Sequence, residues 1–174
     1  MYHLLLTIIS YNSIIILHDS INWIWSKNMT CTFFGHRDAP SELRGRIKTT
    51  LIDLIQSQNA DLFYVGNHGN FDRMAASVLR ELSADFPKIR YFTVLAYLPE
   101  HDSDPAPTVY PEGIELVPKR FAISFRNRFM VEQSDLVIAY VACPCGGAAK
   151  FTNLALKKGK TVINLAPFSG NTNF

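Results

Sequence analysis

Short apolar runs alternate with longer amphipathic stretches along most of the chain. The run at 62–65 is typical of a buried strand, and from Phe71 onward apolar side chains recur at the three- and four-residue spacing of a helix. The same alternation continues on both sides of this unit. We therefore predict strands over 30–34, 62–65, 88–98, 135–141 and 160–165, and helices over 40–59, 71–87, 120–133 and 148–158.

This order of elements predicts an α/β fold. Uninterrupted apolar strands that alternate with helices are typical of a parallel sheet with helices on both faces. We expect a three-layer sandwich in which a central, mainly parallel sheet lies between two layers of helices. In such sheets ligands bind beyond the carboxyl ends of the strands, so the segments that follow the strands are where functional residues are expected.

Local signals predict where the helices end and which faces they bury. Asp38 or Ser41 is the expected N-cap of the first helix, and Asn59 is expected to end it. Three phenylalanines share one face of the helix over 120–133, and we interpret that face as core. These residues are Phe121, Phe125 and Phe129.

Residues 99–118 break the pattern. They contain five prolines and four acidic residues before Ile114, and they show little periodicity. We predict a surface loop with a short strand over 114–117. A loop of this length in a compact domain is often functional, commonly as a lid.

The first 28 residues differ from the rest because they contain neither glycine nor proline and only one basic residue, Lys27. Their apolar part, 4–17, is too short and too polar for a transmembrane helix, and the start is not that of a signal peptide. We interpret residues 1–28 as an upstream extension with Met29 as the native start, so that 29–174 forms one domain. An extra element docked on the domain and, third, a membrane anchor are the alternatives.

Composition narrows the class of protein. The chain has 174 residues, is 48% hydrophobic, and carries a net charge of +2 from 17 basic and 15 acidic residues, so a dedicated nucleic-acid binder is not indicated. The cysteines Cys31, Cys143 and Cys145 do not suggest a disulfide framework and predict a reducing cytoplasm. The C-x-C spacing lacks the second half of a zinc site. We expect no metal, no cofactor and no membrane partner.

Three junctions with glycine or charged residues follow predicted strands, at 35–38, 66–72 and 143–147. A strand that leads into a helix through a glycine loop directs free backbone N–H groups, and the positive end of a helix dipole, at one place that suits a phosphate or carboxylate. Gly66 and Gly69 could also be turn glycines that need positive φ. The convergence of three junctions favours an anion site.

The motifs FFGHRDAP (33–40), FYVGNHGNFDRMA (63–75) and RNRFMVEQSDLVIAYVACPCGGAAKFTNLALKKGKTVINLA (126–166) together resemble the SLOG superfamily. This Rossmann-like group includes the Lonely-guy phosphoribohydrolases, the DNA-processing protein A domain and a bacterial YpsA-like branch, to which the chain is most similar. The resemblance implies a nucleotide or nucleotide-derived ligand at the strand ends, with its phosphate on the glycine loops. Superfamily members often dimerise through their helices, which makes a homodimer an expectation to test.

Residues from all three motifs form the expected ligand-binding set. Arg126 lies where Lonely-guy enzymes carry an arginine, and Asp72 either caps its helix or accepts from a ribose hydroxyl. Arg37 and Arg126 either grip a phosphate or form exposed salt bridges, and His68 is expected to be exposed in its loop. The full set is Gly35, His36, Arg37, Gly66, Asn67, His68, Gly69, Asn70, Asp72, Arg126, Asn127, Cys145, Gly146 and Gly147.

The third motif departs from the PGGxGTxxE motif of the Lonely-guy enzymes. Cys145 is inserted after the proline, and Thr152 and Asn153 fall where the family carries acids. Neither side chain can act as a general base or stabilise an oxocarbenium-like charge as a carboxylate does. The leading hypothesis is therefore a ligand-sensing, non-catalytic nucleotide-binding domain, with no catalytic residue assigned.

Two other functions stay open. One is a nucleotide-processing enzyme with phosphoribohydrolase-like cleavage of an N-glycosidic bond that uses Asp72, Glu132 or Asp38 as its acid. The other is a DNA-processing accessory protein. The near-neutral charge disfavours it, because binding to a phosphate backbone needs clustered Lys and Arg.

Overall fold

The computed structural model describes residues 28–97 and 107–167. The predictions for residues 1–27 and for the part of the loop at 98–106 lie outside the described residues. The elements in chain order are β1 (Met29–Gly35), α2 (Leu43–Gln58), β2 (Ala60–Val65), α3 (Asn70–Asp85), β3 (Arg90–Val94), β4 (Thr108–Val109), the 3-10 helix η1 (Ile114–Leu116), α4 (Lys119–Glu132), β5 (Leu136–Tyr140), α5 (Gly146–Lys157) and β6 (Thr161–Asn164).

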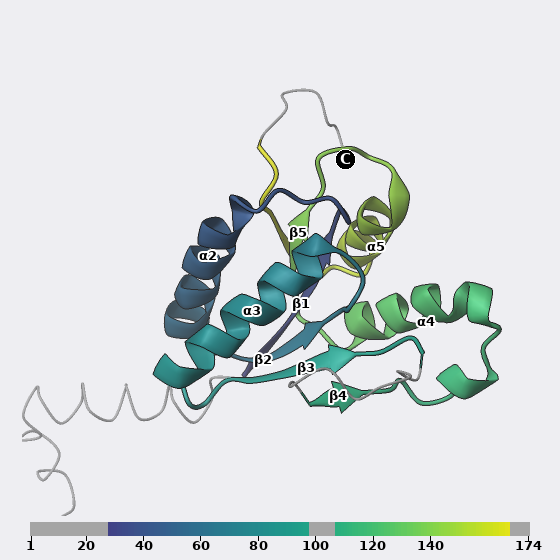
Figure 1. Ribbon diagram of the computed structural model, residues 1–174, viewed down its shortest axis with the longest axis horizontal. Helices are drawn as coiled ribbons and strands as arrows, with labels where there is room; N and C mark the ends of the chain where they lie inside the picture. Colours follow the sequence, from purple (N-terminus) through teal and green to yellow (C-terminus); the bar gives the residue numbers. More distant parts are fainter. Residues whose placement is uncertain (1–27, 98–106, 168–174) are drawn as a thin grey trace, which may run out of the picture.

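The described strands form one six-stranded sheet in the order β4-β3-β2-β1-β5-β6, with every pairing parallel. The α/β, Rossmann-like three-layer architecture expected from the sequence is confirmed (Figure 1). From β1 the chain adds β2, β3 and β4 on one side and then returns to add β5 and β6 on the other. The reversal lies between β1 and β5, where open α/β sheets bind their ligands.

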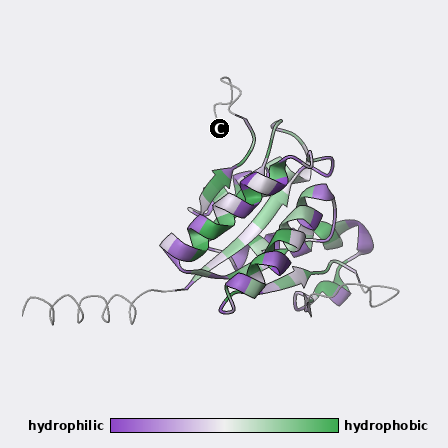
Figure 2. Cartoon of the chain, turned by 60° about the vertical axis from the view of Figure 1, so that its left-hand side comes forward, coloured by the Kyte–Doolittle hydropathy of each residue, from purple (hydrophilic) through white to green (hydrophobic). Residues whose placement is uncertain are grey.

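The two layers of helices follow from the alternation of side chains along the strands. In β1, Phe33 packs in the cluster of buried side chains that includes α2 and α3, whereas Phe34 packs in the cluster of α4 and α5. Apolar residues therefore dominate the strands between the helices, and the helices carry mixed surfaces (Figure 2). None of the described helices is long and apolar enough to cross a membrane.

Several expected boundaries are corrected. Asn59 ends α2, as predicted, and has a left-handed conformation with φ 53°. The N-cap is Glu42, with no capping bond from Asp38 or Ser41. The strand over 88–98 shortens to β3. The other strands and helices lie within two or three residues of their predicted ranges.

The strand predicted over 114–117 is wrong, because this segment forms η1 instead. Gly113 has φ 80°, and the Leu116 N–H donates to its carbonyl at 3.2 Å, which closes a tight turn rather than an extended chain. The described strand of this region is β4, where Thr108 pairs with Thr93 of β3 at the edge of the sheet.

The interpretation of the phenylalanine face of α4 as core is also wrong. Phe121 is 51% exposed and Phe125 is 36% exposed, and Phe129 is only partly buried, against Tyr64. The row that packs inward is shifted by one position. It consists of Ala122, Arg126 and Met130. The buried row of α4 therefore contains an arginine, a feature that the hydrophobic pattern alone would not select.

Candidate functional site

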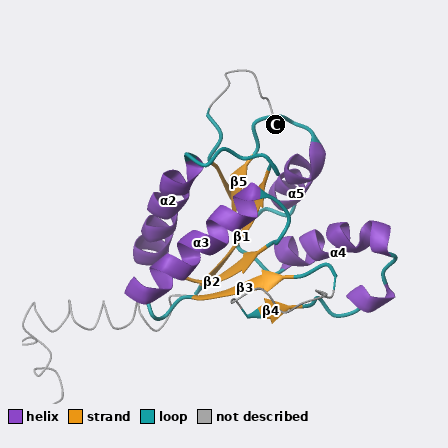
Figure 3. Ribbon diagram, viewed as in Figure 1, coloured by secondary structure: helices purple, strands orange, loops and turns teal. Residues whose placement is uncertain are grey.

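The loop after β1 is hydrogen-bonded to the loops that follow β2 and β5. The imidazole Nε2 of His36 accepts from the backbone N–H of Ala142 at 3.1 Å and of Cys143 at 3.4 Å. The Arg37 carbonyl accepts from the Asn70 N–H at 2.8 Å, at the start of α3. These bonds hold the carboxyl ends of β1, β2 and β5 in one group of loops (Figure 3).

Glycines permit the close contacts between these loops. A side chain at Gly35 would overlap the Phe71 ring, so only glycine allows α3 to pack on the end of β1. Gly69 has φ 123°, and a Cβ there would lie 2.9 Å from the Cα of Arg37. Position 69 therefore requires glycine for two reasons, the positive φ and the close approach of the loop after β1.

The centre of the site is a buried pair of opposite charges. Arg126 of α4 is 2% exposed and Asp72 of α3 is 8% exposed. A Cβ on Gly66 would overlap both the Arg126 guanidinium and the Asp72 carboxylate, so the absence of a side chain at this position makes room for both groups.

Arg126 is held from two sides. Its Nη1 donates to the Val94 carbonyl at 3.2 Å, and its Nη2 lies 3.5 Å from His68 Nδ1, which can accept when that nitrogen carries no proton. Its Nε has no hydrogen-bond partner among the described residues. Burial lowers the pKa of Arg126, an effect that Asp72 opposes, so the guanidinium stays charged.

Asp72 and His68 have shifted pKa values for reasons that the geometry explains. Burial raises the pKa of Asp72 from 3.8 to about 6, against the opposing effects of Arg126 and of the His68 N–H, which donates to Asp72 Oδ2 at 2.9 Å. Burial, then the charges of Arg126 and Arg37, lower the pKa of His68 below its ordinary value. His68 is therefore a neutral acceptor at pH 7, and it is half-buried rather than exposed as expected.

Asp72 does not act as an N-cap. The N-cap of α3 is Gly69, and the carboxylate reaches back from the first turn to the N–H of His68. This bond positions the Asp72 carboxylate beside Arg126 and stabilises the loop that carries His68. The capping role expected from the sequence is thus replaced by a bond that supports the loop.

Cys143 and Cys145 form a disulfide, and Cys31 is free and buried. The number and spacing of the cysteines did not predict this pairing. Cys145 is the N-cap of α5 and has an extended backbone, and Gly146 follows with φ 81°. Burial raises the pKa of Cys31 to about 12, which makes that thiol unreactive. Among the described residues no group of three or more His, Cys, Asp and Glu could hold a metal.

Arg126, Asp72 and His68 line one cavity of about 200 Å³, which lies at the switch point of the sheet. Its wall includes nine of the predicted ligand-binding residues: Gly35, His36, Arg37, Gly66, His68, Asp72, Arg126, Asn127 and Gly147. Five others lie outside the wall: Asn67, Gly69, Asn70, Cys145 and Gly146. Of these, Asn70 supports the site, because its Nδ2 donates to the Ala39 carbonyl at 2.6 Å and joins the first two loops.

Sequence reasoning missed the apolar wall of this cavity. Ile123 and Met130 lie one turn before and after Arg126 on α4, and Ala148 lies in the first turn of α5. Helical spacing from Arg126 was the available signal for the first two. Tyr97 is not part of this wall, but the centroid of its ring lies 6.2 Å from that of the His68 ring, a contact that was also missed.

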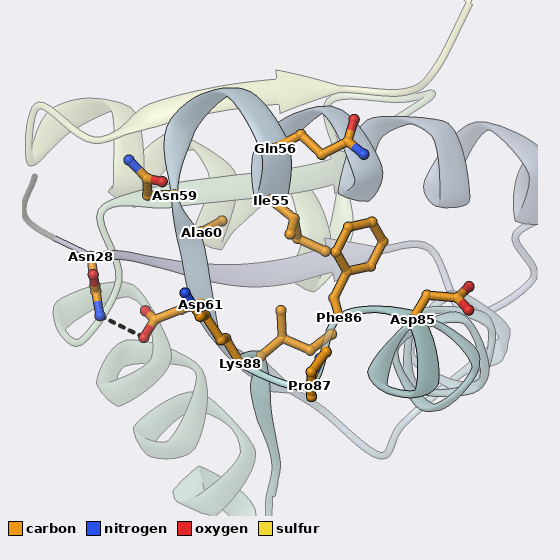
Figure 4. Close-up of a pocket in the computed structure, with 11 residues that line it drawn as sticks. Asn28, Ile55, Gln56, Asn59, Ala60, Asp61, Asp85, Phe86, Pro87 and Lys88 are labelled. Carbon is orange, nitrogen blue, oxygen red and sulfur yellow. Dashed lines mark hydrogen bonds between the residues drawn. The ribbon is translucent and has the colours of Figure 1, made fainter. Parts of the chain in front are cut away.

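A larger cavity of about 630 Å³ lies at the opposite end of the strands, where β1, β2 and β3 begin (Figure 4). The side chains of Ile55 and Phe86 point toward each other there, and Asn28 donates to Asp61 at 2.7 Å. This cavity lies away from the carboxyl ends of the strands, and none of the predicted ligand-binding residues lines it.

In sequence, no known protein family matches the chain, and neither does any curated protein. In structure, the chain is similar to DNA processing protein A (DprA) from Streptococcus pneumoniae, solved by X-ray crystallography, with a TM-score of 0.62 at 14% identity. The similarity covers 82% of this chain and 52% of that one, so the chain spans about half the length of that protein. At this identity the similarity shows a shared Rossmann-like fold.

Proposed function

We propose that the chain is a SLOG-type domain that binds a small nucleotide or nucleotide derivative and does not transform it. The observation that carries this proposal is the buried guanidinium of Arg126, 2% exposed, in the wall of a cavity where three strand-end loops meet. A buried cation is costly unless a partner compensates it, and a phosphate on Arg126 would add to the compensation that Asp72 supplies.

The size of the cavity limits which part of the ligand it takes. Drug-sized ligands occupy pockets of roughly 300–1,000 Å³, and this cavity has about 200 Å³. It suits a phosphate with its ribose, and the base would extend past the loops. The exposed Arg37 and the N-terminus of α5 at Gly147 would face the phosphate from the open side.

The proposal that the domain does not transform its ligand rests on two residues of α5. Thr152 and Asn153 occupy the turn in which the Lonely-guy hydrolases, whose motif this segment resembles, carry acids. Thr152 is 3% exposed, with no hydrogen-bond partner for Oγ1 among the described residues. Such a side chain can shape the wall but cannot carry the charge that cleavage of an N-glycosidic bond requires.

Thermal unfolding and calorimetry with AMP, NAD, ADP-ribose and cyclic nucleotides test the proposal. A ligand present at 100 times its dissociation constant stabilises the fold by about 2.7 kcal/mol. Arg37→Gln removes an exposed cation from the cavity, and Arg80→Gln removes an exposed cation from α3 away from it. We expect Arg37→Gln to weaken binding and Arg80→Gln to leave it unchanged. Absence of any shift with every nucleotide would refute nucleotide binding.

The second candidate is a phosphoribohydrolase-like enzyme, and Asp72 is the observation that favours it. This carboxyl group lines the cavity and has a pKa near 6, which suits a general acid or base close to neutral pH. Release of free base from a bound nucleotide, lost in Asp72→Asn while binding persists, would establish the enzyme. Strong binding of short DNA that fades with salt would instead support a DNA-processing role like the one that the name of the structural neighbour indicates.

A further inference from the structure

The Cys143–Cys145 disulfide lies directly before α5, whose residues Gly147 and Ala148 line the cavity. Cys145 and the intervening Pro144 are exposed, and Cys143 is partly exposed. A small thiol can therefore reach the bond. Exposed disulfides are the ones that exchange readily with thiols, whereas buried structural disulfides resist reduction.

The backbone around the disulfide is connected to the binding site on both sides. Before it, the N–H groups of Ala142 and Cys143 donate to His36, which lines the cavity. After it, Cys145 caps α5 and Gly147 belongs to the cavity wall. The two cysteines are thus one and two residues from groups that contact or form the cavity wall.

We propose that Cys143 and Cys145 form a redox site that exchanges with small thiols, and that the disulfide form is the one that binds the ligand anion. This inference rests on the proposed function for its binding readout but not for its chemistry. The site of modification is the pair of cysteines before α5, and the co-reactant is a thiol or dithiol.

The reaction with a dithiol is a balanced two-electron exchange. One thiolate of the reagent attacks Cys143 Sγ, the S–S bond breaks, and Cys145 leaves as a thiolate. The second thiolate of the reagent then attacks the mixed disulfide and releases Cys143, so that the reagent becomes its cyclic disulfide and the protein gains two thiol groups.

The charge of the reduced form explains the effect on binding. A thiolate at a helix N-terminus is stabilised by the helix dipole, and Cys145 occupies that position on α5. The new negative charge would then compete with a ligand phosphate for the same end of the helix. In the disulfide form this position carries no charge.

The first test measures the chemistry in the full chain without any ligand. The protein is equilibrated in buffers of defined reduced and oxidised glutathione, alkylated, and analysed by peptide mass. We expect the peptide that contains both cysteines to pass from unmodified to doubly alkylated at one midpoint, with Cys31→Ala giving the same midpoint because Cys31 is buried. Two alkylated cysteines under every oxidising condition would overturn the proposal.

The second test measures binding of AMP at pH 8 to the oxidised and reduced protein. We expect the reduced form to bind about three- to tenfold more weakly, the range that one charge at a helix end produces. Cys145→Ser cannot form the disulfide and places a neutral hydroxyl at the N-cap, so reductant should not change its affinity. Equal affinities of oxidised and reduced protein, or an equal response of Cys145→Ser to reductant, would overturn the effect on binding. If AMP and the other nucleotides bind neither form while the glutathione midpoint is observed, the proposed function fails and the redox site stands.

Discussion

The buried carboxylate of Asp72 should make the folded state less stable as the pH rises. Its pKa is about 6 in the folded protein and 3.8 in its ordinary environment, so the folded state binds the proton more tightly. The stability that comes from the protonated form is complete below pH 3.8 and is lost as the pH rises to 6 and just above. At about 1.4 kcal/mol per pKa unit, the loss amounts to about 3 kcal/mol.

Asp72→Asn isolates this effect because its amide resembles the protonated carboxyl and keeps an oxygen for the His68 N–H. The attraction between Asp72 and Arg126 is already included, since the pKa is raised in spite of it. We therefore expect the variant to be nearly as stable as the wild type at pH 4 and more stable by up to about 3 kcal/mol at pH 7.5.

Urea unfolding of both proteins at several pH values between 4 and 8 provides the measurement. The quantity to compare is the difference in free energy of unfolding between variant and wild type, because other groups that titrate cancel in it. Asp85→Asn removes an exposed carboxylate from the other end of the same helix and serves as the control. A difference that is constant with pH, or that favours the wild type at pH 7.5, would refute the reasoning.

Two other pairs of variants test the packing. Gly66→Ala places a Cβ against the Arg126 guanidinium and should lower the free energy of unfolding in urea by about 1–3 kcal/mol. Gly45→Ala lies in an open part of α2 and should raise that free energy by up to about 1 kcal/mol. The reverse order would contradict the argument that Gly66 makes room for the buried charges. Phe121→Ala should cost only about 1 kcal/mol, because half of the side chain is exposed, whereas Met130→Ala should cost about 2–5 kcal/mol. Comparable losses would mean that the phenylalanine face is buried after all.

The sequence was sufficient for the fold because continuous apolar strands and amphipathic helices follow directly from burial. It was insufficient on α4, where the periodic row of phenylalanines is more apolar than the row that packs inward. Arg126 lies in that inward row because it meets Asp72, His68 and the Val94 carbonyl, which come from distant parts of the chain. A hydrophobic pattern records how apolar each position is, and it does not contain the position of a polar partner on another element.

The loops show the same division. The glycines at 35, 66 and 69 were recognised as junction residues. The reason why each must be glycine depends on a different tertiary contact, with Phe71, Arg126 and Arg37 respectively. The Cys143–Cys145 disulfide was missed because spacing along the chain does not show whether two sulfur atoms face each other. The signals that pointed to the candidate site were the ends of parallel strands, which topology brings together irrespective of side-chain detail.

Binding of a phosphate should be coupled to a proton at Asp72. A phosphate held by Arg126 adds negative charge beside a carboxyl group whose pKa is already about 6, and this raises that pKa further. At pH 7 the protein should therefore take up protons at Asp72 when AMP binds. Calorimetry in two buffers with different ionisation enthalpies measures the number of protons. The phosphate of AMP also titrates, so the informative quantity is the uptake by the wild type minus the uptake by Asp72→Asn. We expect this difference to be positive. A value of zero, with AMP bound by both proteins, would place the phosphate away from Asp72 and Arg126.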